Sequence, residues 1–107
     1  IAAARPIGIS IIDGIYTMSG GEGPWNVGRL KPVRPGLLVA GLNAVCTDAV
    51  GTALMGFDPM AERGTPPFES CDSSLKLAEE LGVGTRDLSR IEIAGVAIGD
   101  AAFRIRG

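Results

Sequence analysis

Hydrophobic and polar positions change their spacing along the chain, and the changes divide it into short elements. Ile7–Ile12 (I-G-I-S-I-I) is β-branched and almost wholly apolar, which predicts a strand buried on both faces. Asp13-Gly14 is a turn signal, and Ile15–Met18 is interpreted as an extension of the strand beyond a bulge at the glycine. Gly36–Ala40 (G-L-L-V-A) predicts a second short buried strand.

The stretch from Asn43 to Pro59 predicts the helix around which the rest of the chain packs. Its apolar positions cover most of a 3.6-residue helical wheel, which is typical of a buried helix. Asn43 is a good N-cap, and Gly56 is placed to end the helix in the left-handed conformation. The remaining side of the wheel carries Thr47, Asp48, Gly51 and Thr52. This polar side suits the close approach of a ligand, and it equally suits contact with water or a neighbouring loop.

The second half of the chain predicts one more helix and two weaker strands. Asp72–Leu81 has the pattern of an amphipathic helix. Asp72 or Ser73 can cap its start, and Gly82 ends it. Thr85–Leu88 resembles a short capped turn. Ile91–Val96 alternates as a half-buried strand does, and Ala102–Arg106 predicts an exposed edge strand protected by its arginines.

These elements predict an α/β or α+β domain of three-layer type, with three or four strands and two main helices. A length of 107 residues is sufficient for a single small domain, residues 1–107, and not for two. The chain begins at Ile1 and not at methionine, which suggests a fragment, a processed product or part of a longer chain. The domain is therefore expected to be part of a larger fold.

Composition narrows the possible functions. A net charge of −2 and the lack of a run of Lys or Arg disfavour nucleic acid as a partner. No apolar run approaches the ~20 residues that span a bilayer, so we expect no membrane association and a cytoplasmic location. The absence of histidine excludes a His-based triad or a His-ligated metal within these residues. Cys46 and Cys71 are too sparse for an iron–sulfur cluster, and we expect them to be reduced, inert thiols.

Two segments have a composition that suits an anionic ligand. Ser19–Pro24 is rich in glycine, and its backbone N–H groups can cup an anion, although a simple turn has the same composition. The following segment, Trp25–Pro35, carries Arg29, Lys31 and Arg34 between prolines. It is either a solvated loop or the rim of a site for a negatively charged ligand or partner.

Three acids are the candidate ligand-binding groups. Asp13 lies at the end of a strand, Glu22 lies in the glycine loop, and Asp48 lies on the polar side of the central helix. Open α/β sheets bind ligands beyond the carboxyl ends of their strands. If the three acids converge there, they can hold a hard cation such as Mg²⁺ or polarise a substrate. The candidate ligand-binding residues are Asp13, Gly20, Gly21, Glu22, Asn43 and Asp48, and the sequence assigns no catalytic residue, no dedicated metal ligand and no cofactor.

Three blocks of the chain have a recognisable order and spacing. The first block is I-D-G-I at Ile12–Ile15, followed by Met18, Gly20 and Gly23-Pro24. The second is Gly41–Val50, followed by Leu54–Pro59. The third is Asp87-Leu88, which leads into Ile91–Gly95. The blocks resemble the bacterial and archaeal family called domain of unknown function 362. The resemblance implies that the chain is the C-terminal part of a longer domain. Some members of that family carry a ferredoxin-like iron–sulfur module, so the resemblance also implies an iron–sulfur domain or protein as a partner.

Three hypotheses for the function follow. The first is a small-molecule or metal-binding domain, with or without an enzymatic activity. The second is a redox accessory module that docks against an iron–sulfur domain and supplies no cofactor ligands. The third is a structural half-domain, in which the glycines and acids serve turns and caps and Asp48→Asn lowers stability.

Overall fold

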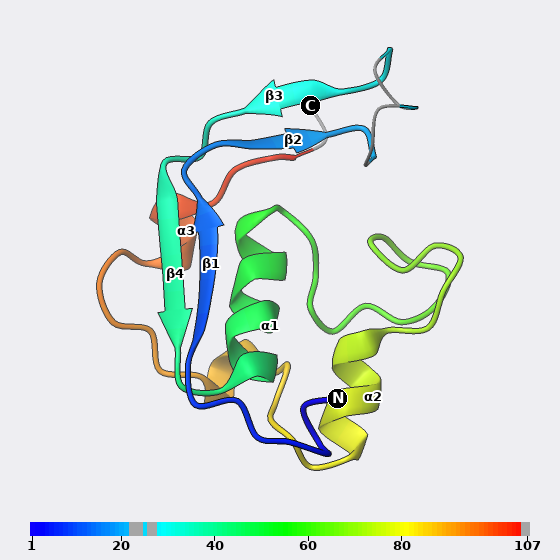
Figure 1. Ribbon diagram of the computed structural model, residues 1–107, viewed down its shortest axis with the longest axis vertical. Coiled ribbons are helices and arrows are strands. Elements are labelled where there is room, and N and C mark those ends of the chain that lie inside the picture. The colour runs from blue at the N-terminus through cyan, green and yellow to red at the C-terminus, as the bar shows by residue number, and fades with distance from the viewer. Residues whose placement is uncertain (22–24, 26–27, 106–107) are drawn as a thin grey trace.

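The fold is a small α+β domain built on one long bent hairpin. A computed structural model describes residues 1–21, 25 and 28–105. The elements with described bounds are β1 (Ser10–Gly14), β2 (Thr17–Ser19), β3 (Lys31–Val33), β4 (Leu37–Gly41), α1 (Ala44–Leu54), α2 (Ser74–Glu80), η2 (Leu88–Arg90) and α3 (Ile98–Ala101). The hairpin, α1 and α2 follow one another as three layers across the molecule (Figure 1).

The four strands form two antiparallel pairs along the same hairpin. β1 pairs with β4, and β2 pairs with β3. Between the two pairs, the backbone N–H of Gly36 donates to the carbonyl of Ile15 over 3.4 Å. Because the strands are antiparallel, the rule that places ligands beyond the carboxyl ends of parallel strands does not apply to this sheet.

Local sequence signals set the ends of both main helices, as predicted. Asn43 caps α1 by accepting a 3.0 Å hydrogen bond from the backbone N–H of Cys46. Gly56 follows the helix with φ of 89°, a conformation that a residue with a side chain rarely adopts. Ser73 caps α2 in the same way, through a 3.1 Å bond from the N–H of Lys76. Gly82 has φ of 74° after that helix.

The core is a small apolar cluster between α1 and α2. Val45, Ala49 and Leu75 are buried at its centre, and Ala49 is 0% exposed. Phe68, Ala78, Val83 and Ile91 pack around these three residues and are partly buried. On its other side α1 lies against the hairpin, where the lack of a side chain at Gly51 makes room for Ile12. The central helix predicted from the sequence is therefore the element that joins the layers.

The first strand is covered on one face only, so the prediction that it is buried on both faces is wrong. Burial alternates along β1, with Ser10 and Ile12 half-buried and Ile11 exposed. Ile9 and Ile11 are 59% and 66% exposed. An antiparallel hairpin with a helix on one side leaves its other side open, and in the described residues no element covers that side.

The two strands predicted near the C-terminus are not formed in the described residues. Ile91 leaves η2 in an extended conformation, but Ile91–Val96 has no strand partner and Gly95 has φ of 91°, and the chain then forms α3. The C-terminal segment pairs instead with the end of α1, where the N–H of Phe103 donates to the carbonyl of Leu54 over 2.8 Å. Arg106, the last residue of the second predicted strand, lies outside the described residues. The half-buried strand predicted from the alternation at Ile91–Val96 is therefore not formed.

A buried arginine holds the loop after α1 against α2. Arg86 is 6% exposed, and its guanidinium donates to the carbonyl of Met60 over 3.1 Å and to Glu79 over 3.4 Å. The Arg86 backbone N–H and the Thr85 hydroxyl also donate to Glu79, and these bonds hold the pKa of that carboxyl below its ordinary value. Arg86 therefore joins segments about 25 residues apart.

We predict that Arg86→Met lowers the free energy of unfolding by about 2–4 kcal/mol, because it leaves two loop carbonyls and Glu79 without their buried donor. Urea unfolding followed by circular dichroism measures the loss. Arg63→Met is the matched control, since the Arg63–Asp72 pair is about two-thirds exposed on each side, 64% and 65%, and should cost less than about 1 kcal/mol. Equal losses in the two variants would contradict the role of Arg86.

A second prediction concerns the contact between Gly84 and the start of α1. A Cβ at this position would meet Asn43 Oδ1 and would lie 2.8 Å from Cβ of Val45. Gly84→Ala should therefore cost about 1–3 kcal/mol of stability, because both neighbours are fixed near the backbone. Gly99→Ala is the control: its Cβ would meet nothing within 4 Å, and alanine favours the helix that contains it. Thermal unfolding of the two variants would show a lower midpoint for Gly84→Ala alone.

Candidate functional site

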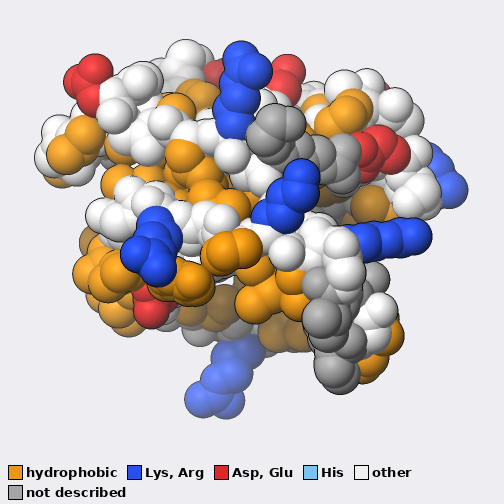
Figure 2. Space-filling model, turned by 90° about the horizontal axis from the view of Figure 1, so that it is seen from above, with side chains coloured by type: hydrophobic (Ala, Val, Ile, Leu, Met, Phe, Trp, Pro, Cys, Tyr) orange, Lys and Arg blue, Asp and Glu red, His pale blue; other side chains and the backbone are white. Residues whose placement is uncertain are grey.

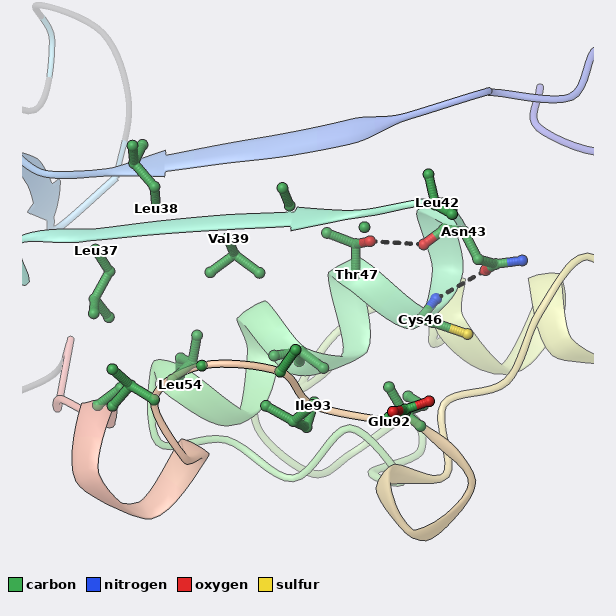
Figure 3. A pocket seen from close by; sticks show the side chains of 18 of the residues that line it. Leu37, Leu38, Val39, Leu42, Asn43, Cys46, Thr47, Leu54, Glu92 and Ile93 are labelled. Atoms are coloured by element: carbon green, nitrogen blue, oxygen red, sulfur yellow. Dashed lines mark hydrogen bonds between the residues drawn. The ribbon is translucent and has the colours of Figure 1, made fainter.

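A large cavity lies between β4, α1 and the segment Ile91–Val96. Its volume is about 700 Å³. Figure 3 shows Leu37 and Val39 projecting from β4 toward the helix, with Leu54 and Ile93 on the opposite wall. Because successive side chains of a strand point to opposite faces, Leu38 points away from the cavity (Figure 3). Most of the wall is therefore aliphatic.

Polar groups gather at the end of the cavity where α1 begins. Asn43, Cys46, Thr47 and Glu92 line it there. The Asn43 amide is already engaged, since its oxygen caps α1 and its nitrogen donates to the carbonyl of Val83 over 2.8 Å. The Thr47 hydroxyl donates to the carbonyl of Asn43 over 2.7 Å. A ligand would therefore meet two polar groups without a hydrogen bond to a described residue, the Cys46 thiol and the exposed Glu92 carboxylate (Figure 3).

Asp48 lies away from this cavity. It lines a smaller cavity of about 360 Å³ between β1, α1 and α2, together with Ser10, Ile12 and Leu75. Partial burial beside these side chains raises the pKa of the Asp48 carboxyl above its ordinary value. The residue as a whole is exposed, and its carboxylate accepts no hydrogen bond from a described residue.

Asp13 lies on the opposite face of the hairpin from Asp48. Its neighbour Ile12 points to α1 and lines the cavity beside Asp48, so Asp13 points outward from the same strand. One oxygen of the Asp13 carboxylate accepts a 3.1 Å hydrogen bond from the N–H of Ile15, two residues further on. This is the geometry of a turn. The structure does not bring Asp13 and Asp48 to a common hollow.

The two glycines in the candidate set serve the turn of the hairpin. Gly20 and Gly21 have φ of 102° and 106°, and a side chain on Gly20 would collide with the Arg29 carbonyl, which precedes β3. Glu22 lies outside the described residues. In the part of the chain that the structure describes, no three Asp, Glu, Cys or His side chains are grouped so that they can hold a metal ion.

The polar side of α1 is mostly satisfied within the helix. Thr47 and Thr52 are buried, at 5% and 6% exposed. The Thr52 hydroxyl donates to the carbonyl of Asp48 over 2.8 Å, one turn earlier, as Thr47 does to Asn43. Three of the four small polar residues therefore serve helix packing, and only Asp48 presents a functional group outward.

Sequence reasoning missed the larger cavity because its walls are distant in the sequence. β4 and Ile91–Val96 are about 50 residues apart, and each is an ordinary apolar segment when considered alone. Neither segment carries a local signal that marks it as a wall of a shared cavity. Cys46 and Glu92 carried no motif that marks them as lining residues.

Compared with known proteins, the chain matches no family model, no curated protein and no solved structure. The described helices are all too short or too polar to cross a bilayer. The arrangement of the side chains is therefore the basis for assigning a function.

The surroundings of Asp48 change the expectation for Asp48→Asn. Since the raised pKa means that the folded state disfavours the charged form, this substitution should not lower stability at neutral pH, and it should change the free energy of unfolding by no more than about 0.5 kcal/mol. The difference from wild type should vanish as the pH falls below the ordinary pKa of 3.8, where the carboxyl is neutral in both states. Urea unfolding across this pH range measures it. A loss of several kcal/mol at neutral pH would reveal a structural partner for Asp48.

Proposed function

We propose that this α+β domain binds a small, mainly apolar molecule in the cavity between β4, α1 and Ile91–Val96. The observation that carries the proposal is the size and lining of this cavity. Its volume of about 700 Å³ lies within the ~300–1,000 Å³ of typical ligand pockets, and aliphatic side chains form most of its wall. The proposal retains small-molecule binding from the sequence but places it at a different site from the three acids.

The polar end of the cavity indicates the chemistry of the ligand. Glu92 is an acceptor, and the Cys46 thiol, which also lines the cavity, is a weak donor. A ligand with an aliphatic or aromatic body and a hydroxyl, amine or other donor at one end matches this distribution. A carboxylate or phosphate at that end would meet the charge of Glu92, so anionic ligands are disfavoured. Our proposal for this site is binding, without an assigned reaction.

We also propose that the chain is a divergent C-terminal portion of the family called domain of unknown function 362. The support is the order and spacing of the sequence blocks that include Ile12–Ile15 and Gly41–Val50. These blocks lie on β1 and α1, the two elements that meet at Gly51. An iron–sulfur domain or protein as a partner belongs to this proposal, and it makes a redox accessory module the second candidate function.

An exposed apolar face on the hairpin favours this second candidate, since a module that docks against another body needs such a face. The cytoplasmic location expected from the sequence stays part of this proposal, and it agrees with Cys46 and Cys71 not being joined in a disulfide. A purely structural half-domain remains the third possibility, and it predicts that the cavity has no affinity for small molecules.

Binding of Nile red, an uncharged apolar dye, tests the proposed cavity. We predict saturable binding to the wild type, and at least a tenfold weaker affinity for Val39→Trp, because the indole would fill the space between β4 and α1. Leu38→Trp is the matched control, since the adjacent side chain is 65% exposed on the opposite face of the same strand. Fluorescence titration measures the affinity.

Thermal unfolding would show whether Val39→Trp is folded, and Ile93→Asp provides an independent second change on the facing wall. Equal affinity of wild type, Val39→Trp and Ile93→Asp for the dye would exclude this cavity as the binding site. Loss of binding in Leu38→Trp alone would place the dye on the outer face of the hairpin.

A further inference from the structure

The outer face of the hairpin is an apolar surface that no described element covers. On β1 and β4 it carries Ile11 and Leu38, and next to these strands it carries Ile9 and Leu42; in chain order Ile9, Ile11, Leu38 and Leu42 are 59%, 66%, 65% and 81% exposed. The strand register explains this grouping, because Ile11 and Asp13 lie opposite Ala40 and Leu38 on the same face. Met18, 52% exposed, continues the surface along β2. We call this surface the outer hairpin face.

The total surface of the molecule is larger than a monomer of this size needs. Its accessible area is 7354 Å², whereas about 5,600 Å² is typical of a folded monomer of 11.0 kDa. The excess is about twice the ~800 Å² that each partner buries in a standard protein interface. Contiguous exposed apolar surface of this kind marks an interaction site.

Charges on the outer hairpin face are arranged in a self-complementary way. Asp13 is the acid in the middle of the face, and Arg34 is exposed toward the hairpin end, in step with Leu38 and Ala40 along the same arm of the hairpin. Arg34 lies over the ring of Tyr16, with 5.0 Å from the guanidinium carbon to the ring centroid. Seen from the hairpin end, apolar side chains cover much of the surface and Lys and Arg side chains project around them (Figure 2). Among the described residues Arg34 has no ion-pair partner.

We propose that a second copy of this chain covers the outer hairpin face and forms a two-fold symmetric dimer. In a two-fold dimer the same patch meets itself, so a face with an acid at one point and a cation at another satisfies both pairs at once. An axis that lies in the plane of the face and crosses the strands between Asp13 and the hairpin end places Asp13 of each copy against Arg34 of the other. The Ile, Leu and Met side chains of the two hairpins then pack as the inner faces of a β-sandwich do.

The size of the protein in solution tests the dimer. Sedimentation equilibrium at micromolar concentrations should give twice the chain mass for the wild type, and Ile11→Asp should weaken the association at least tenfold, because it places a charge in the apolar contact. Leu77→Asp is the control, since Leu77 is an equally apolar residue, 50% exposed on α2 and away from the hairpin, and it should leave the dimer intact. Circular dichroism would confirm that each variant keeps its helices.

Charge reversal tests the two-fold arrangement independently. Asp13→Arg and Arg34→Asp should each weaken the dimer, and the double variant should recover most of the lost affinity, because the two side chains meet only across the axis. A wild type that sediments as a monomer at all concentrations would overturn the proposal. A dimer that Ile11→Asp leaves unchanged would also overturn it, because the contact would then lie elsewhere.

Discussion

The amide of Asn43 is the contact on which the arrangement of this domain most depends. Its oxygen caps α1, and its nitrogen donates to the carbonyl of Val83, beyond the end of α2. One side chain therefore sets where the central helix begins and how the second helix returns to it. Gly84 leaves room for this contact, because a Cβ there would meet the amide oxygen. Asn43 was a candidate for ligand binding, but its amide oxygen and nitrogen are both engaged in these two hydrogen bonds. Its role in the structure is therefore to hold the fold.

The position of α1 then determines what each side of the hairpin can do. The helix covers the inner face at Gly51 and Ile12, and a cavity lies between the helix, β4 and the segment Ile91–Val96. This cavity, with its aliphatic walls, lies on one side of β4. The other side of β4 has no covering layer in the described residues, so Leu38 and its neighbours are exposed. Alternate residues of a single strand thus belong to two different surfaces.

The sequence predicted those parts of the fold that local chemistry determines. Asn43, Gly56, Ser73 and Gly82 placed the helix ends correctly because a cap or a left-handed glycine acts within a few residues. Ile91–Val96 failed as a strand because a strand needs a partner, and alternation alone does not supply one.

The candidate site was less predictable than the fold, for the same reason. Asp13 follows Ile12 in the sequence, and Asp48 of α1 lines the same cavity as Ile12. The Asp13 side chain nevertheless points to one side of β1, and Asp48 lies on the other side. Strand alternation predicts from the sequence that Asp13 and Ile12 point to opposite sides of β1. The sequence does not show that Asp48 lies on the same side as Ile12, because that depends on how α1 packs on the hairpin. The cavity between β4 and Ile91–Val96 also depends on such non-local packing, which a linear pattern does not contain.

The disagreement over the first strand has a physical interpretation that connects sequence and assembly. A continuous apolar run such as Ile7–Ile12 is typical of a strand with both faces covered, and the isolated chain covers only one of them. A strand that met water on its outer face would gain nothing from Ile9 and Ile11, and their exposure favours aggregation. The pattern and the open face agree once a second protein layer lies on the hairpin. Because sequence composition responds to the environment in the assembled state, the run is better explained by a covered outer face than by a solvated one.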